Sequence, residues 1–284
     1  MDYARPTTLE EALELMRSRP WTVLAGGTDF YPALGGGPVK ADVLDINSLG
    51  ELKGISRSDS HIVIGARMSW SELLEAPLPP VFDMLKQAAR DVGSVQIQNV
   101  GTVAGNLCNA SPAADGVPPL LALDAEVTLT SHAGKRHVPL SSFILGNRQT
   151  MREADELVTA IRVPVAACEG RSGFVKLGAR RYLVISIAMA AARLVLDSGR
   201  VRGVAIAVGS CSAVARRLAG LEAVLAGASR DAVPALVAAY GFPELAPIDD
   251  VRGTASYRRE AAREIVARAL AQAAGEGLGG GIAA

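Results

Sequence analysis

Two glycine-rich turns carry the residues of this chain whose types and spacing suit ligand chemistry. The first is Ala25-Gly26-Gly27-Thr28-Asp29, and the second is Gly101-Thr102-Val103-Ala104-Gly105-Asn106, continued by Ser111-Pro112-Ala113-Ala114-Asp115. Glycine leaves the backbone uncovered, so N–H groups can approach a phosphate closely, and Thr28 and Thr102 each add a hydroxyl. Neither turn contains Lys or Arg. The two turns therefore predict a cradle for one phosphate-rich ligand, built from oriented amides and hydroxyls.

The charge balance of the chain gives no preference for polyanionic partners. Lys and Arg together number 29, Asp and Glu together number 29, and the formal net charge is +0. The excess positive charge that attracts nucleic acid or an anionic membrane is missing. The longest apolar run, 184–196, is interrupted by Ser186 and Arg193 and is shorter than the about 20 residues that span a bilayer. We expect no nucleic-acid partner and no membrane insertion.

The cysteine pattern bears on metal sites and on the compartment. Cys108, Cys168 and Cys211 are dispersed and form no C-x-x-C pair, so neither a disulfide framework nor a zinc or iron–sulfur site is indicated in this chain. The N-terminal residues lack the basic-then-apolar pattern of a signal peptide. These features predict a cytoplasmic protein in a reducing compartment, without metal ligands of its own.

Short helices and strands are expected around the two turns in the first half of the chain. Thr7 or Thr8, followed three residues later by Glu10 or Glu11, predicts a capped helix that includes Leu9 to Met16. Two strands that flank the first turn predict a small β-α-β-like unit. The other apolar patterns predict further helices and strands. The expected strands are 21–25, 43–46, 61–66, 125–130 and 157–163, and the expected helices beyond the first are 69–74 and 81–90.

The composition changes after Pro164, where the Ala- and Gly-rich segment 165–173 resembles a linker. Strands are expected at 174–177, 187–196 and 201–208, and helices at 215–225, 230–240 and 255–273. This order predicts an antiparallel sheet covered by helices. At 284 residues, the length suits two domains. The predicted domains are 1–169, with lobes of about 1–55 and 56–169, and 170–274, followed by a flexible Gly-rich tail at 275–284.

The ordered set of motifs resembles the FAD-binding medium subunit of the molybdenum hydroxylases, the group that includes xanthine dehydrogenases and carbon monoxide dehydrogenase. The resemblance covers nearly the whole chain, and the order of its motifs makes it specific. The matching segments are 25–29, 64–66, 98–106, 111–115, 155–158 and 176–181. The resemblance implies an α+β fold: a two-lobed FAD-binding domain of the vanillyl-alcohol-oxidase (PCMH) type, then a smaller C-terminal α+β domain with an antiparallel sheet and helices.

The same resemblance implies which residues bind the cofactor. Segments 23–30 and 102–106 would enclose the diphosphate, Asp115 would hydrogen-bond the nucleotide part, and Val158 would line the cofactor. Lys176 would lie close to it with a positive charge that favours the reduced, anionic flavin. The implied cofactor-binding residues are Val23, Leu24, Ala25, Gly26, Gly27, Thr28, Asp29, Phe30, Gly101, Thr102, Val103, Ala104, Gly105, Asn106, Asp115, Val158 and Lys176.

The residues alone leave other interpretations open. Asp115 also fits a helix cap, Lys176 also fits a solvated strand position, and Cys108 fits an inert buried thiol. Ala104 stands where the family usually has a second glycine, which adds a methyl group beside the diphosphate. Relatives that attach flavin covalently usually use a histidine, and no histidine lies in either glycine turn. We therefore expect noncovalent FAD.

The resemblance implies an electron-transfer function. FAD in this chain would accept electrons from iron–sulfur clusters of a partner and pass them to an external small-molecule acceptor such as NAD. The expected partners are a large molybdenum-cofactor subunit and a small two-iron two-sulfur subunit, and no side chain of this chain is expected to be catalytic. Two alternatives are a self-sufficient flavin oxidoreductase of the same fold and a flavin-free scaffold subunit.

Overall fold

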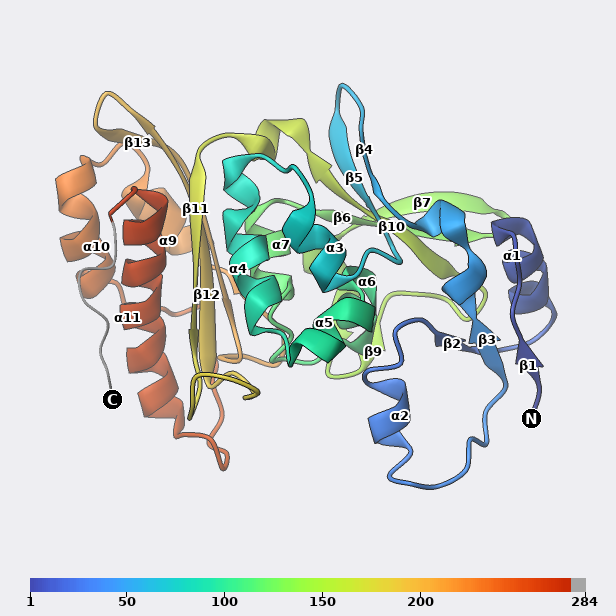
Figure 1. The fold of residues 1–284 in the computed structure, drawn as a ribbon. Coiled ribbons are helices and arrows are strands. Elements are labelled where there is room, and N and C mark those ends of the chain that lie inside the picture. The colour runs from blue at the N-terminus through green and yellow to red at the C-terminus, as the bar shows by residue number, and fades with distance from the viewer. Residues whose placement is uncertain (277–284) are drawn as a thin grey trace.

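The computed structural model describes residues 1–276 as three regions that lie side by side (Figure 1). A small parallel sheet at the N-terminus is followed by a central five-stranded antiparallel sheet with helices, and then by a four-stranded antiparallel sheet with helices. The expected α+β class is confirmed. Residues 277–284 of the predicted tail lie outside the described residues. No helix within residues 1–276 is long and apolar enough to cross a membrane.

The N-terminal region positions the first glycine turn. Its three strands pair in parallel in the order β1-β3-β2, and α2 lies between β2 and β3 in the chain, as the β-α-β prediction requires. Thr8 caps the first helix, because its hydroxyl accepts a hydrogen bond from the Glu11 N–H at 3.2 Å. The elements are β1 (Tyr3–Ala4), α1 (Leu9–Ser18), β2 (Thr22–Leu24), α2 (Phe30–Ala33) and β3 (Val43–Asp45).

The central region positions the second glycine turn. Its antiparallel sheet has the strand order β4-β5-β10-β6-β7, and β8 and β9 form a separate hairpin. The strands are β4 (Ile55–Arg57), β5 (His61–Gly65), β6 (Glu126–Ser131), β7 (Gly134–Pro139), β8 (Ile144–Gly146), β9 (Gln149–Thr150) and β10 (Leu157–Pro164). The helices are α3 (Trp70–Glu75), α4 (Asp83–Asp91), α5 (Val95–Val100), α6 (Val103–Asn109), α7 (Val117–Ala122) and α8 (Leu140–Phe143). Ser69 starts α3 with a complete capping box.

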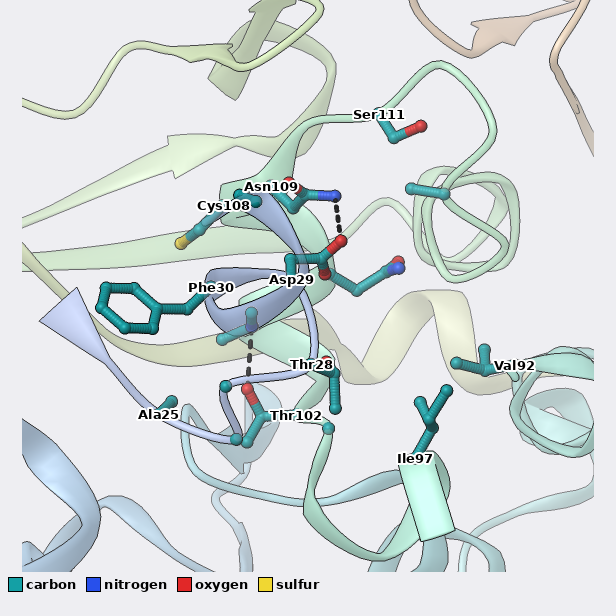
Figure 2. Close-up of a pocket in the computed structure, with 18 of the residues that line it drawn as sticks. Ala25, Thr28, Asp29, Phe30, Val92, Ile97, Thr102, Cys108, Asn109 and Ser111 are labelled. Carbon is teal, nitrogen blue, oxygen red and sulfur yellow. Dashed lines mark hydrogen bonds between the residues drawn. The ribbon is translucent and has the colours of Figure 1, made fainter. Parts of the chain in front are cut away.

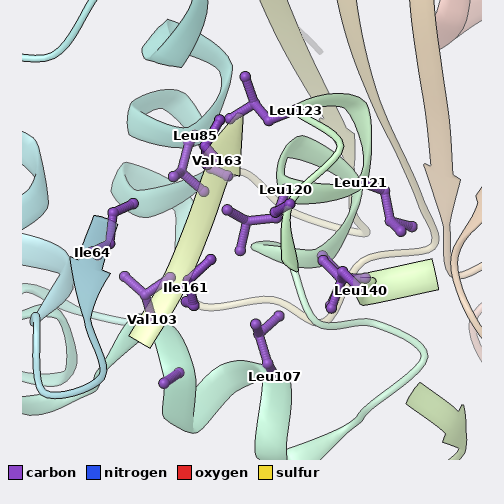
Figure 3. Packing of buried hydrophobic residues seen from close by; sticks show 14 of the residues in the cluster. Ile64, Leu85, Val103, Leu107, Leu120, Leu121, Leu123, Leu140, Ile161 and Val163 are labelled. Atoms are coloured by element: carbon purple, nitrogen blue, oxygen red, sulfur yellow. The ribbon is translucent and has the colours of Figure 1, made fainter. Parts of the chain in front are cut away.

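The central core lies between this sheet and the helices. Ile161 and Val163 of β10 pack with Val103 and Leu107 of α6 and with Leu120 of α7 (Figure 3). All five side chains are fully buried. Burying apolar side chains of this size stabilises the fold by about 1.5–3 kcal/mol each. The helix that follows the second glycine turn is therefore fixed by packing.

The C-terminal region is a sheet in the order β11-β12-β13-β14, with helices on one face and the central region on the other. Along β12, Ala188 and Ala190 face the helices, whereas Met189 and Ala191 belong to the central core. This strand is buried on both faces, which explains its continuous apolar sequence. The elements are β11 (Arg171–Leu177), β12 (Ala188–Asp197), β13 (Arg200–Gly209), β14 (Arg216–Arg217), α9 (Ala219–Leu225), α10 (Val233–Ala239) and α11 (Ala255–Ala273).

Two segments differ from the predicted elements. The helix expected at 215–225 begins at Ala219, because Arg216 and Arg217 form the edge strand β14 and pair with β13. The linker expected at 165–173 contains a short 3-10 helix, Val165–Cys168, and the start of β11 at Arg171. In both places tertiary pairing overrides weak local preference.

The C-terminal region is joined to the central region by hydrogen bonds and by apolar contact. The Ser172 hydroxyl accepts a hydrogen bond from the Met84 N–H at 3.0 Å, and the Phe174 N–H donates to Gln87 Oε1 at 2.7 Å. The Phe174 side chain belongs to the central core. The domain boundary near residue 169 stays a prediction, but the two regions meet across a packed interface.

Leu107→Ala tests the packing beneath the second turn. The side chain is fully buried, so its truncation should reduce the free energy of unfolding by about 2–5 kcal/mol, measured by urea denaturation. Leu145→Ala is the control, because Leu145 is 59% exposed and its loss should change the free energy by about 0.5 kcal/mol or less. Equal effects of the two substitutions would contradict the assignment of Leu107 to the core.

Candidate functional site

The two glycine turns meet in space although Gly27 and Gly101 are 74 positions apart in the sequence. A Cβ on Gly26 would lie 1.9 Å from the carbonyl oxygen of Val100 and 3.0 Å from the Cα of Gly101. No side chain fits there, so glycine is required for this backbone contact, which we call the turn contact. A further link joins the first turn to α6, because Asn109 Nδ2 donates to Asp29 Oδ1 at 3.1 Å (Figure 2).

The first turn presents free amides. Within residues 1–276, the backbone N–H groups of 26–30 donate no hydrogen bond to the protein. The Thr28 hydroxyl also makes no hydrogen bond in that part of the chain, and Gly27 has a positive φ of 72°. All five residues line the same cavity. Consecutive unpaired amides beside a free hydroxyl are suited to binding an anion, so the anion site expected at this turn stays a prediction that the geometry permits.

A polar chain holds the first turn in place. Asn47 Nδ2 donates to the Ala25 carbonyl at 2.8 Å and to Asp45 Oδ1 at 2.8 Å. The second carboxylate oxygen of Asp45 accepts from the Tyr3 hydroxyl at 2.6 Å. The turn is thereby fastened through its carbonyl to strand β3, and its amides remain available.

The second turn is organised differently from the prediction. Only Gly101 and Thr102 connect α5 to α6, and residues 103–106 form the first part of α6. Most amides here are already used: Gly101 N–H donates to Ile97 at 2.7 Å, Val103 N–H to Met68 at 3.0 Å and Gly105 N–H to the Thr102 hydroxyl at 2.9 Å (Figure 2). Of residues 101–106, only Thr102 and Ala104 have N–H groups without a partner in the described part of the chain.

Two further glycines of the turns lie against side chains of the protein. A Cβ on Gly27 would lie 2.7 Å from the Tyr31 ring, and a Cβ on Gly105 would lie 2.7 Å from the Thr102 hydroxyl oxygen that caps α6. The sequence indicates that these glycines leave the backbone open to a phosphate, and the structure adds a second role. They also permit the local packing that gives the turns their shape.

A cavity of about 990 Å³ opens between the turns and extends to the C-terminal region. Its volume and concave, mixed polar and apolar lining suit a large organic ligand. Sixteen of the seventeen predicted cofactor-binding residues line it. Val103 does not line it, because its side chain is fully buried in the central core and its N–H is bonded to Met68.

Asp115 and Lys176 form a buried ion pair at the C-terminal end of the cavity. Lys176 Nζ lies 2.6 Å from Asp115 Oδ2, and the Ser186 hydroxyl donates to Asp115 Oδ1 at 2.6 Å. Lys176 also donates to the Asp91 carbonyl at 3.1 Å. Both carboxylate oxygens of Asp115 are thus engaged within the protein, so the carboxylate has fewer free lone pairs for a ligand than the sequence suggests.

The pairing changes the electrostatics expected of Lys176. Burial raises the pKa of Asp115 above its usual range, while the ammonium of Lys176 and the hydroxyl of Ser186 oppose that rise. A carboxylate 2.6 Å away offsets most of the positive potential that Lys176 would direct into the cavity. The Asp115–Lys176 pair therefore presents a dipole to the cavity and not the net positive charge expected of Lys176.

The chain segment before β10 is fixed by another ion pair. Arg136 donates to the two oxygens of Glu156 at 2.6 and 2.7 Å, and the Glu153 N–H donates to Glu156 at 2.9 Å. The next two residues, Leu157 and Val158, line the cavity. The Arg136 guanidinium holds the pKa of Glu156 below its usual range.

Sequence reasoning missed several residues that line the cavity. Arg148 and Arg152 reach it from the segment that includes the β8–β9 hairpin, and Leu183 and Ile185 reach it from the segment between β11 and β12. The adjacent paired arginines of the 176–181 motif were the only signal that this last segment approaches the site. No motif marked Arg148 or Arg152.

Comparison with known proteins assigns the family. The domain described as "FAD binding domain in molybdopterin dehydrogenase" matches residues 1–166, and the "CO dehydrogenase flavoprotein C-terminal domain" matches residues 174–273. The chain is 30% identical over 276 residues to the glyceraldehyde dehydrogenase medium chain of Sulfolobus acidocaldarius, covering 96% of this chain and 98% of that one. It is also 30% identical to the carbon monoxide dehydrogenase medium chain of Hydrogenophaga pseudoflava, with 95% of each chain covered.

The fold agrees with these sequence matches. A solved structure of carbon monoxide dehydrogenase from Hydrogenophaga pseudoflava superimposes with a TM-score of 0.87 at 29% identity, covering 97% of this chain and 98% of the other. The chain belongs to the family of FAD-binding subunits of molybdopterin dehydrogenases. The resemblance stated from the motifs is confirmed, and so is the class of oxidoreductase.

Gly26→Ala tests the turn contact. The added methyl group would overlap the Val100 carbonyl and push the turns apart, so the dissociation constant for FAD should rise at least about tenfold, or about 1.4 kcal/mol. FAD titration followed by flavin fluorescence measures this change, and far-ultraviolet circular dichroism checks the fold. Gly50→Ala is the matched control, because a Cβ at Gly50 meets nothing within 4 Å. Unchanged affinity in Gly26→Ala would contradict the turn contact.

Glu156→Gln tests the segment before β10 through its pH dependence. Because the pKa of Glu156 is lower in the folded state, its stabilising contribution is present above the unfolded pKa of about 4.3 and disappears as the pH falls through the folded value. The wild type should exceed the variant in free energy of unfolding at pH 7, and the difference should shrink at pH 3.5. Glu169→Gln, which breaks the exposed ion pair with Arg202, should change the stability by about 1 kcal/mol or less. A difference that stays constant with pH would be inconsistent with this ion pair.

Proposed function

We propose that this chain is the FAD-carrying electron-transfer subunit of a molybdenum hydroxylase complex and binds FAD noncovalently in the cavity between the two turns. One observation carries the proposal. The unpaired amides of residues 26–30 and the start of α6 line the same cavity, which has a volume of about 990 Å³. When bound, FAD would supply the redox chemistry by accepting electrons from a partner and passing them to an external acceptor.

The residues of this chain would bind and orient the cofactor. The amides and the Thr28 hydroxyl would hold the diphosphate without a nearby lysine or arginine from either turn. The Asp115 and Lys176 pair would set the polarity at the C-terminal end of the cavity. Leu183 and Ile185, which are 54% and 55% exposed, add apolar side chains to the lining there.

The proposed partners follow from the relatives. The matched proteins are named as medium chains or FAD subunits, and one matched solved structure is titled as a Cu,Mo-CO dehydrogenase. We propose a large subunit with the molybdenum cofactor and a small subunit with two-iron two-sulfur clusters as partners of this chain. A cytoplasmic location and a small-molecule acceptor such as NAD belong to the same proposal.

Purification of the chain from its native source tests this function. We expect about one FAD per chain, measured by the oxidised-flavin absorbance after denaturation, and co-purification of two further subunits that contain molybdenum and iron. A colourless, folded chain that does not take up added FAD would contradict the cofactor. Substrate oxidation by the FAD-loaded chain alone would favour a self-sufficient flavin oxidoreductase instead.

A further inference from the structure

Two arginines bring positive charge to the cavity outside the glycine turns. Arg148 lies in the connection between β8 and β9, Arg152 follows β9, and both line the cavity together with Cys108, Asn109 and Ser111. Arg148 is exposed, and Arg152 is partly exposed. The arginines therefore lie where the cavity can be reached from solvent.

Neither arginine is neutralised by an acidic side chain. Within residues 1–276, no carboxylate lies within 4 Å of either guanidinium. The acids that follow Arg152 are Glu153, Asp155 and Glu156, and Glu156 is held by Arg136 at 2.6 Å. Arg152 Nη1 instead donates to the main-chain carbonyl of Glu156 at 2.8 Å, which anchors the side chain without a direct ion pair. Its charge adds to that of Arg136 in lowering the pKa of the Glu156 carboxyl. The Cys108 thiol, which is exposed and lines the cavity, lies close enough to Arg152 for the positive charge to oppose the desolvation that raises the pKa of the thiol.

The backbone at Arg148 is strained. Its φ is +57°, a left-handed conformation that costs a non-glycine residue about 1–2 kcal/mol. Arg148 is the second of two residues between β8 and β9, a position where a turn with this φ favours glycine. A hydrogen bond from Arg148 N–H to the Ala110 carbonyl, 3.2 Å long, fixes the turn to the end of α6. The hairpin thus holds Arg148 beside the end of α6 and at the cavity.

We propose that Arg148 and Arg152 form an anion subsite at the entrance of the cavity, which binds the phosphate or carboxylate group of the diffusible electron acceptor. This inference rests on the proposed function, since it requires FAD deeper in the cavity. The free amides of residues 26–30 already offer a site for the diphosphate of FAD. The arginines are accessible to solvent, so they suit a ligand that binds and leaves at each turnover.

The test measures anion binding and cofactor binding separately. Inorganic pyrophosphate is titrated by calorimetry into the FAD-loaded chain at one fixed ionic strength, and FAD is titrated into the flavin-free chain. In the double variant Arg148→Gln and Arg152→Gln, the dissociation constant for pyrophosphate should rise about tenfold or more, since two charged hydrogen-bond donors are lost. The dissociation constant for FAD should change by about twofold or less, well below the about tenfold change expected for pyrophosphate.

A matched double variant controls for net charge. Arg57→Gln with Arg216→Gln removes two exposed arginines that do not line the cavity, and it should leave pyrophosphate binding unchanged. An equal loss of pyrophosphate binding in both double variants, or no loss in either, would overturn the subsite. The subsite would also be overturned if the Arg148→Gln, Arg152→Gln variant bound FAD more weakly and the FAD-loaded wild type bound no pyrophosphate. The arginines would then hold the diphosphate of FAD itself.

Arg148→Gly separates side-chain function from turn shape. Glycine adopts φ +57° without strain, so the melting temperature should not fall while pyrophosphate binding weakens. A variant that binds pyrophosphate as tightly as the wild type would contradict the role of Arg148. If the wild type takes up no FAD, the proposed function fails, and pyrophosphate titration of the flavin-free chain and its Arg148→Gln, Arg152→Gln variant still decides the subsite.

Discussion

The contact of Gly26 with the Val100 carbonyl is the constraint on which the site depends. It brings a turn of the N-terminal parallel sheet against the connection between two helices of the central region, and a single methyl group would prevent it. The two turns contribute unequally. The first turn supplies free amides, whereas most amides of the second turn are bonded to α5, to α6 or to Met68, which follows β5. The second turn is therefore mainly the rigid wall against which the first is placed.

The C-terminal region completes the cavity. Ser186 and Lys176, which belong to this region, both contact Asp115 of the central region, and Ser210 N–H donates to the Pro112 carbonyl at 2.9 Å just upstream of Asp115. Lys176 lies in β11, Ser186 just before β12 and Ser210 just after β13, so these contacts come from the C-terminal sheet, whose strand β12 packs on both faces. Residues of both family-model domains line the cavity, and the proposed cofactor site therefore involves both regions of the chain.

Sequence reasoning could identify the turns and most elements because these depend on local patterns. Thr8, one of the two predicted cap residues, caps α1, and Ser69 caps α3 at the start of the helix predicted for 69–74. Sequence reasoning did not identify the helix at 103–109, because its first four residues, Val-Ala-Gly-Asn, belong to the glycine motif and the helix is short, so that core packing holds it. The engagement of Asp115 by Ser186, and the approach of Arg148 to α6, join residues far apart in the chain and have no local signature.

Hydrogen–deuterium exchange with and without FAD tests the central claim most directly, because it reports on individual stretches of backbone amide. The account predicts that FAD slows exchange in peptides covering residues 26–30, whose amides have no partner in the described structure, and changes exchange much less at Gly101, Val103 and Gly105, which are already bonded. FAD that binds with full occupancy and leaves residues 26–30 unprotected would contradict it.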